Sequence, residues 1–286
     1  MKNGWARSIS LIIIREYFTS IDVRFLKKQF FIWIALLIAC ITLQLLKIPT
    51  NAIAFTYLNT SKYLDLDSLW SNLTLLGDTG ILWPMMLIFA LGSIERLYAV
   101  LAAVPVGGLL SLVLKRLFDE PRPAGVIQLA DMHIIGPMLK THGFPSGHSI
   151  TIFAAFSVIL LTCSFKSNLY NAIFKSAILM LGAMVVISRI MVGAHWPFDC
   201  LAGVCIGWLS GLSGIYTVKI FYKHLQTFKL HLTIVSLLWL VSISNIFRQF
   251  DYPGSNIAVA LSLLISSIFF ATYIHMHKKS IAGFFA

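Results

Sequence analysis

The most constraining feature of this sequence is a series of apolar stretches, each about as long as a lipid bilayer is thick. Of its 286 residues, 58% are hydrophobic and only 12% are charged, which is unusual for a soluble domain. A membrane-spanning helix needs about 20 mainly apolar residues. Eight stretches meet this need: 29–47, 70–92, 97–117, 148–165, 171–190, 200–219, 230–247 and 255–275. The sequence therefore predicts an all-α fold, a polytopic transmembrane helical bundle.

The charged residues support a membrane protein rather than a nucleic-acid-binding one. The net charge is +11, but the cations are scattered over short loops and do not alternate with exposed aromatic residues, so we expect no nucleic-acid partner. Cations precede the first stretch without a small-residue cleavage pattern, which predicts a retained anchor. The segment 9–30 mixes apolar and charged residues, as an interfacial helix or a solvated leader does. The four cysteines contain no CxxC pair and are predicted to be packing residues.

The distribution of Lys and Arg predicts the orientation of the bundle. With a cytoplasmic N-terminus, the inner loops receive fourteen of these residues and the outer loops eight, of which three belong to polar motifs. We therefore expect the N-terminus in the cytoplasm and the motif-bearing loops on the periplasmic or exterior side. The short loops and the Ile- and Lys-rich composition favour a bacterial inner (plasma) membrane.

Three polar motifs lie at the ends of predicted helices on that outer side. Ionisable groups in such positions are functional candidates, because a bilayer disfavours charge that is not needed. Arginine presents a planar fork that matches two phosphate oxygens, and lysine adds a mobile point charge. The motifs are Lys115 with Arg122-Pro123, Pro145-Ser146-Gly147-His148, and Ser188-Arg189 with His195 and Asp199.

Each motif has a functional and a structural interpretation. Ser146 suits the N-cap of a helix, where free backbone N–H groups bind anions and Gly147 permits close approach. The spacing of His195 and Asp199 lets the carboxylate fix the imidazole tautomer, as in a nucleophile–orienter pair. Taken singly, the same residues are compatible with snorkelling, helix capping or a structural histidine.

Two further groups of polar residues have weaker functional interpretations. Asp78 on the outer face is predicted to be a turn residue, with a contact to a motif cation as the alternative. The loop residues Asp131, His133 and His142, with His148, outline a metal site only loosely, because no HxxxH or HExxH spacing is present. We therefore predict no metal and no cofactor.

Taken together and in order, the motifs resemble the signature of the type-2 phosphatidic acid phosphatase superfamily, also called lipid phosphate phosphatases. The family pattern is KxxxxxxRP, then PSGH, then SRxxxxxHxxxD, and every specified position matches within about residues 70–220. The resemblance implies a six-helix transmembrane phosphatase core, assigned to residues 30–220. An N-terminal cytoplasmic or interfacial segment, 1–29, precedes it, and two additional helices in 221–286 follow it and are expected to be peripheral to the chemistry.

The resemblance also implies a role for each motif residue. His195 would be the nucleophile, Asp199 would orient it, and His148 would protonate the leaving oxygen and later activate water. The remaining residues would bind the non-bridging phosphate oxygens, with cations in place of a metal ion; they are Lys115, Arg122, Ser146, Gly147 and Arg189.

The expected activity is hydrolysis of a lipid phosphomonoester or diphosphate at the extracytoplasmic face through a phosphohistidine intermediate. Undecaprenyl diphosphate, phosphatidylglycerol phosphate, phosphatidic acid and lipid A phosphates all fit this chemistry. A lipid phosphotransferase would use the same intermediate, and a non-catalytic anion or lipid transporter would use only the cations. A vanadate-dependent haloperoxidase has a related pocket, but a membrane-buried chain argues against it.

Overall fold

The computed structural model describes residues 21–59, 66–91, 93–165, 167–225 and 227–278, and this part of the chain is helical without a β-sheet. The expectations for residues 1–20 lie outside the described residues. The α-helices are α3 (Val23–Leu45), α4 (Thr50–Asn59), α5 (Asp67–Leu75), α6 (Thr79–Met85), α7 (Ile94–Phe118), α8 (Gly147–Thr162), α9 (Asn168–Met191), α10 (Pro197–Phe221), α11 (Phe228–Ser244) and α12 (Asn256–Met276). Short 3₁₀ segments are η1 (Met86–Leu91), η2 (Pro123–Gly125), η3 (Leu129–Asp131) and η4 (Tyr222–Leu225).

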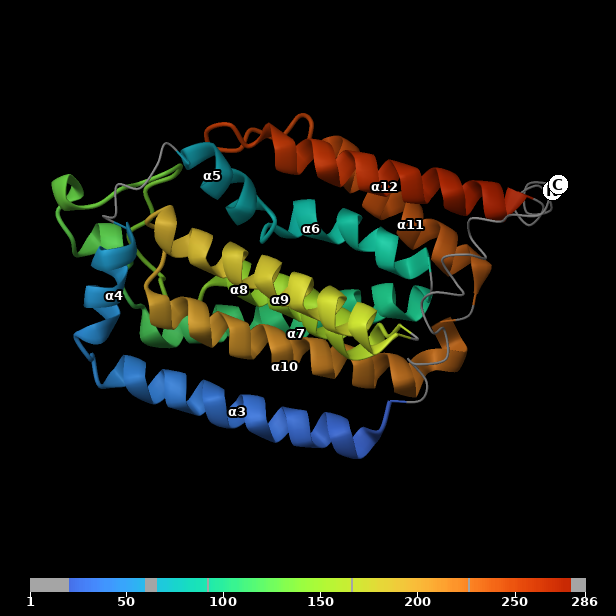
Figure 1. Cartoon of the computed structure of the whole chain (residues 1–286), viewed down its shortest axis with the longest axis horizontal. Coiled ribbons are helices and arrows are strands. Elements are labelled where there is room, and N and C mark those ends of the chain that lie inside the picture. Colours follow the sequence, from blue (N-terminus) through green and yellow to red (C-terminus); the bar gives the residue numbers. More distant parts are fainter. Residues whose placement is uncertain (1–20, 60–65, 92, 166, 226, 279–286) are drawn as a thin grey trace.

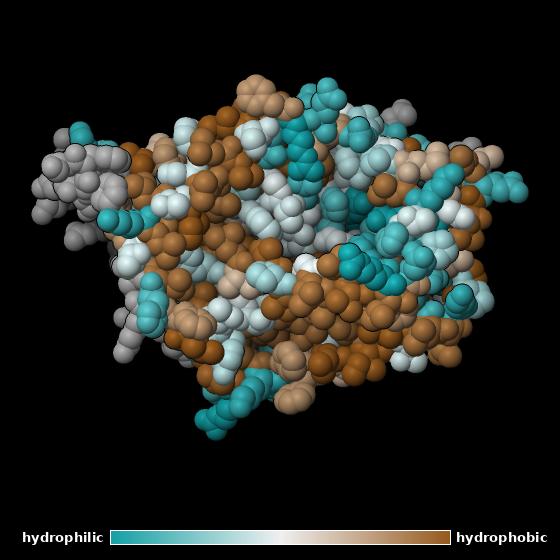
Figure 2. Space-filling view, turned by 180° about the vertical axis from the view of Figure 1, so that it is seen from behind, coloured by the Kyte–Doolittle hydropathy of each residue, from teal (hydrophilic) through white to brown (hydrophobic). Residues whose placement is uncertain are grey.

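The long helices lie side by side, with α3 along one edge and α12 along the other (Figure 1). Five of the described helices are long and apolar enough to cross a membrane, or six if the bent pair α5–α6 is one span. Figure 2 shows a flank that is largely hydrophobic, with many hydrophilic side chains towards one end. This arrangement confirms the predicted all-α bundle of membrane-spanning helices.

The eight predicted stretches all contain helix, but their boundaries and continuity differ from the prediction. The helix α3, which contains the first predicted stretch, begins at Val23 rather than at residue 29, and α8 and α11 are shorter than a full span. The stretch 70–92 is not one helix: it is broken between α5 and α6, with a bend of 70°. Asp78 caps the new helix by accepting a hydrogen bond from the Gly80 N–H at 2.9 Å. The helix α4 was not predicted.

The centre of the bundle is α10, which packs against α3, α7 and α8. Gly203 and Gly207 lie one turn apart on α10. A Cβ on Gly203 would lie 2.6 Å from the Ser146 carbonyl oxygen, and a Cβ on Gly207 would lie 2.6 Å from the Ile150 carbonyl oxygen. Small residues let membrane helices approach at backbone distance. The first turns of α8 and α10 are therefore held next to each other, and both carry motif residues.

Candidate active site

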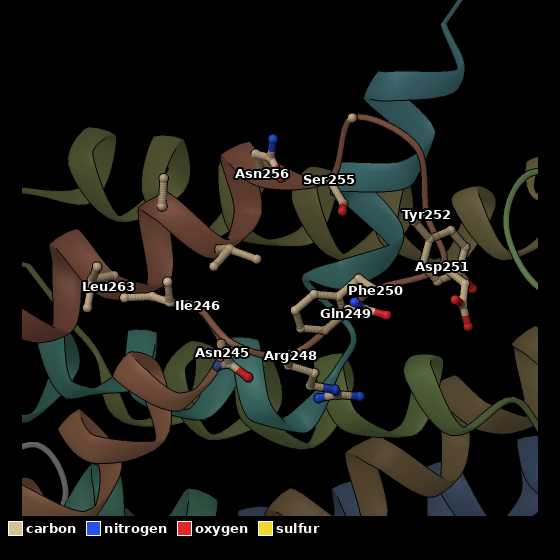
Figure 3. Close-up of a pocket in the computed structure, with 13 residues that line it drawn as sticks. Asn245, Ile246, Arg248, Gln249, Phe250, Asp251, Tyr252, Ser255, Asn256 and Leu263 are labelled. Atoms are coloured by element: carbon tan, nitrogen blue, oxygen red, sulfur yellow. The ribbon is translucent and has the colours of Figure 1, made fainter.

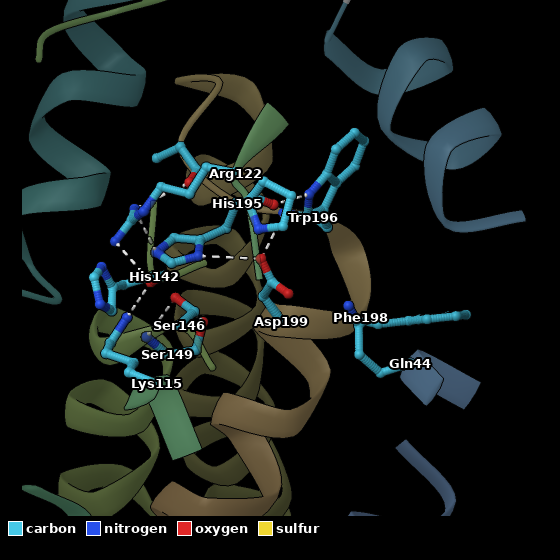
Figure 4. A network of polar contacts seen from close by, with 12 residues as sticks. Gln44, Lys115, Arg122, His142, Ser146, Ser149, His195, Trp196, Phe198 and Asp199 are labelled. Carbon is cyan, nitrogen blue, oxygen red and sulfur yellow. Dashed lines mark hydrogen bonds and ion pairs between the residues drawn. The ribbon is translucent and has the colours of Figure 1, made fainter. Parts of the chain in front are cut away.

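The loops that carry the three motifs meet at one end of the bundle, on the left in Figure 1. These loops follow α7, precede α8 and join α9 to α10. Figure 4 shows residues of all three motifs around one point, joined by a continuous set of polar contacts. The structure thus brings the predicted motifs together.

The first motif is fixed by backbone carbonyls of the loop before α8. Lys115 lies in the last turn of α7, which ends at Asp119 in the left-handed conformation, with φ 39°. The Lys115 Nζ donates to the His142 carbonyl at 2.7 Å, and the Arg122 Nε donates to the Thr141 carbonyl at 2.8 Å. Carbonyl partners orient both cations without neutralising their charge.

The second motif forms the start of α8, as predicted. Ser146 is the N-cap, and its buried hydroxyl accepts hydrogen bonds from the N–H and the hydroxyl of Ser149, at 3.4 and 3.1 Å. A Cβ on Gly147 would meet no atom within 4 Å, so open space adjoins this residue. His148 follows in the first turn and packs against Gly77 at the break between α5 and α6. The helix break therefore makes room for His148.

The third motif contains the catalytic candidate His195 between a carboxylate and a guanidinium. The His195 Nδ1 lies 3.4 Å from the Asp199 Oδ2, and the His195 Nε2 lies 3.1 Å from the Arg122 Nη1. A guanidinium can only donate hydrogen bonds, so Nε2 is the acceptor and the proton sits on Nδ1, facing the carboxylate. This tautomer leaves the Nε2 lone pair available as a nucleophile once a phosphate oxygen takes the arginine N–H.

Charge and burial keep His195 neutral. Its side chain is 2% exposed. Burial, followed by the charges of Arg122, Arg189 and Lys115 and by His148, holds the pKa of His195 well below its usual value of 6.5. The predicted site residues that lower this pKa therefore lie within electrostatic range of the imidazole.

Arg189 is held by residues that sequence reasoning did not include. Arg189 lies in the last turn of α9, and its side chain is only 1% exposed. Its Nη1 donates to the hydroxyl of Thr74 on α5 and to the Tyr252 hydroxyl, which is 3.1 Å away in the loop between α11 and α12. The loop between the two C-terminal helices therefore reaches a candidate site residue, Arg189.

Two hydrogen bonds to backbone carbonyls connect the motifs to one another. The Trp196 indole donates to the Pro121 carbonyl at 2.8 Å, which connects the third motif to the first. The Ser146 N–H donates to the Asp199 carbonyl at 3.0 Å, which connects the second to the third. Trp196 was overlooked although it lies inside the third motif, directly after His195.

The remaining polar candidates are occupied elsewhere. Asp78 forms a bidentate ion pair with Arg248, which is not one of the motif cations. His133 pairs with Asp67 at 2.9 Å and His142 with Asp119 at 3.5 Å, so these histidines face separate carboxylates. Within the described residues, no group of three or more His, Cys, Asp or Glu side chains is arranged to hold a metal ion.

Comparisons with known proteins match the part of the chain that carries these motifs. Residues 96–223, which contain all three motifs, match the family model described as the PAP2 superfamily. The chain is 34% identical to the lipid A 1-phosphatase of Rhizobium etli over 124 residues, which are 39% of this chain and 46% of that protein. It is 40% identical to phosphatidylglycerophosphatase B of Haemophilus influenzae over 73 residues, which are 24% of this chain and 29% of that protein. The matched segments thus span less than half the length of these curated relatives.

A solved structure has a similar fold. The crystal structure of Aquifex aeolicus LpxE is similar to this one with a TM-score of 0.50 and 26% sequence identity. The similarity covers 59% of this chain and 96% of that chain. The family match, the relatives and this fold agree: residues 96–223, with all three motifs, are similar to the PAP2 superfamily.

Proposed function

We propose that this protein is a membrane phosphatase that hydrolyses a lipid phosphomonoester or diphosphate through a phosphohistidine at His195. The observation that carries the proposal is the position of His195, whose Nδ1 faces Asp199 and whose Nε2 faces the cation Arg122. A neutral imidazole with a fixed tautomer is a nucleophile, and the nearby cations offer a place for the phosphate charge.

The reaction follows in two steps. In the first, the His195 Nε2 attacks phosphorus, the bond to the leaving oxygen breaks, and His148 gives that oxygen a proton. In the second, His148 takes a proton from water, the water oxygen attacks phosphorus, and the P–N bond breaks to release phosphate. Lys115, Arg122 and Arg189 stabilise the charge on the non-bridging oxygens, so that the transfer depends on positioning and electrostatics.

A cavity beside the motifs supports a lipid substrate. It has a volume of about 150 Å³ and lies between α6, α7 and α8, with Gly147 among its lining residues. Most of its other lining residues are apolar or small, including Trp83, Val100 and Ile150. Such a cavity suits part of a hydrocarbon tail whose phosphate lies at the start of α8. The names of the relatives point to lipid A and phosphatidylglycerophosphate as the first substrates to test.

We further propose that the site opens to the extracytoplasmic side of a bacterial inner membrane, because the charge count places the motif-bearing loops there. A cysteine introduced in place of Lys140, in the exposed loop before α8, should react with a membrane-impermeant maleimide added outside intact cells. Labelling only from the cytoplasmic side would contradict this orientation.

The central experiment is phosphate release from a lipid panel by the purified protein in detergent micelles. The panel contains phosphatidic acid, phosphatidylglycerol phosphate, undecaprenyl diphosphate and lipid A, and His195→Ala is assayed beside the wild type. We expect the variant to lose activity on every lipid while retaining the wild-type melting temperature. Activity equal to wild type in His195→Ala would overturn the mechanism, and transfer of labelled phosphate to an added lipid without free phosphate would show a phosphotransferase instead.

A further inference from the structure

The loop between α11 and α12 lies outside the residues that match the family, yet it is anchored firmly beside the motifs. Arg248 donates from Nη1 and Nη2 to the two carboxylate oxygens of Asp78, at 3.0 Å each. Asn245 donates to the Gly80 carbonyl at 2.7 Å, and Asn72 donates to the Gly254 carbonyl at 2.7 Å. The start of the loop is thus fixed to the first turn of α6 and its end to α5, on either side of the break.

Tyr252 lies between these anchors, and its ring and its hydroxyl have different neighbours. Its half-buried ring lines a surface pocket of about 690 Å³ between this loop and the first turns of α12, and Figure 3 shows it at one end of that pocket. The ring also packs on a buried cluster of Ile135, Val192 and Ala194. Its hydroxyl reaches Arg189, at 3.1 Å from Nη1. The anchored loop therefore holds the hydroxyl at a fixed position beside the arginine.

The chemistry of the Arg189 partners matters as much as their positions. Thr74 and Tyr252 are neutral, and both accept from the same nitrogen, Nη1. A carboxylate partner would cancel much of the guanidinium charge, as Asp78 does for Arg248. Two hydroxyls instead fix the orientation of a buried guanidinium and leave its charge for an anion. Within the described chain, the buried Nε of Arg189 has no hydrogen-bond partner.

We propose that Tyr252 is a positioning residue of the phosphate site, and that the α11–α12 hairpin is a working part of this active site. This inference rests on the function proposed above. Tyr252 acts through Arg189: its hydroxyl holds the guanidinium in the direction in which it binds the phosphate oxygens. Thr74, which precedes the family-matched residues 96–223 in the sequence as Tyr252 follows them, is the second hydroxyl that holds this guanidinium.

The test uses the full-length protein in detergent micelles, with the panel lipid that wild type hydrolyses fastest and with inorganic phosphate as a competing product. We expect Tyr252→Phe, which removes only the hydroxyl, to raise KM and the phosphate inhibition constant together by about tenfold. The value of kcat and the ligand-free melting temperature should change little. A purely structural role would lower the melting temperature without moving both constants.

Two further substitutions make the result specific. Thr74→Val should raise the same two constants, whereas Thr74→Ser, which keeps the hydroxyl, should restore them to near wild type. Gln249→Ala is the matched control, because Gln249 is exposed on the same loop, and it should behave as wild type.

The inference fails if wild type is active but Tyr252→Phe leaves KM and the phosphate constant unchanged, or lowers kcat alone. It also fails if Tyr252→Phe does not fold, since the hydroxyl would then be structural. Failure of the proposed function looks different: wild type itself would neither hydrolyse a lipid of the panel nor gain thermal stability from inorganic phosphate.

Discussion

Asp199 offers the sharpest test of the mechanism, because among the described residues one of its carboxylate oxygens has two polar contacts and the other has no hydrogen-bond partner. Its side chain is fully buried. The Oδ2 atom accepts from the Trp196 N–H at 3.0 Å and lies 3.4 Å from the His195 Nδ1. Within the described residues, Oδ1 has no hydrogen-bond partner. An asparagine can therefore place its oxygen at the Oδ2 position and keep both contacts, while its amide replaces the unpartnered oxygen.

Asp199→Asn should accordingly keep the imidazole tautomer and remove only the negative charge that would stabilise the proposed phosphohistidine. A hydrogen bond to a charged group contributes about 1.5–3 kcal/mol, so we expect kcat to fall roughly 10- to 150-fold. Asp199→Ala removes orientation as well, and we expect a loss of about 10³- to 10⁴-fold. The measurement is the rate of phosphate release, together with acid-labile radiolabelled phosphate trapped on the protein after rapid quenching.

The control is Asp131→Asn, a change on the exposed loop that should leave both readouts unchanged. If Asp199→Asn loses as much activity as Asp199→Ala while remaining folded, the shared oxygen does not preserve the tautomer. If it loses less than about threefold, the carboxylate charge has no part in the reaction, and the His195–Asp199 pair is structural.

Three other outcomes are expected. Gly147→Ala should not lower the melting temperature, since its Cβ meets nothing within 4 Å, but it should raise KM if substrate occupies that space. Gly203→Ala, whose Cβ would lie 2.6 Å from the Ser146 carbonyl oxygen, should destabilise the protein by about 1–3 kcal/mol. The reverse pattern would contradict the site geometry. Because the pKa of His195 is held well below 6.5, the imidazole stays deprotonated as the pH falls through 6.5, and the acid limb of kcat/KM should lie below that pH. Arg122→Gln removes a neighbouring positive charge and should move that limb to higher pH on the same substrate, and an unmoved limb would show that another group controls it. EDTA should leave phosphate release unchanged, and loss of activity that added Mg²⁺ restores would refute a site built on cations alone.

The local features of this fold were predictable because they depend on short segments. Each of the eight apolar stretches contains helix, and Ser146 begins α8 as its N-cap. The motif residues also meet as expected, because alternate loops of a helical bundle lie on the same side. These predictions required only length, hydropathy, capping preference and loop parity.

The break within the stretch 70–92 was missed because the stretch as a whole is apolar, although Gly77, Asp78 and Thr79 at the break are turn and capping residues. The chain turns between Leu75 and Thr79 with a bend of 70°, where Gly77 lies against His148 and Asp78 pairs with Arg248. Both partners are distant in sequence. Their contribution appears only once α8 and the α11–α12 loop are packed beside the break.

The sequence alone determined the membrane-spanning helical class, the identity of the phosphate-binding and catalytic candidates, and their common side. Only the tertiary structure decided that Arg122 contacts the Nε2 of His195, and that Thr74 and Tyr252 hold Arg189. The physical reason is that apolar helix surfaces are much alike, so the pattern of apolar residues does not reveal how the helices are rotated and shifted relative to one another. Backbone-level packing, such as that at Gly203 and Gly207 on α10, fixes that register and with it the partner of each polar side chain.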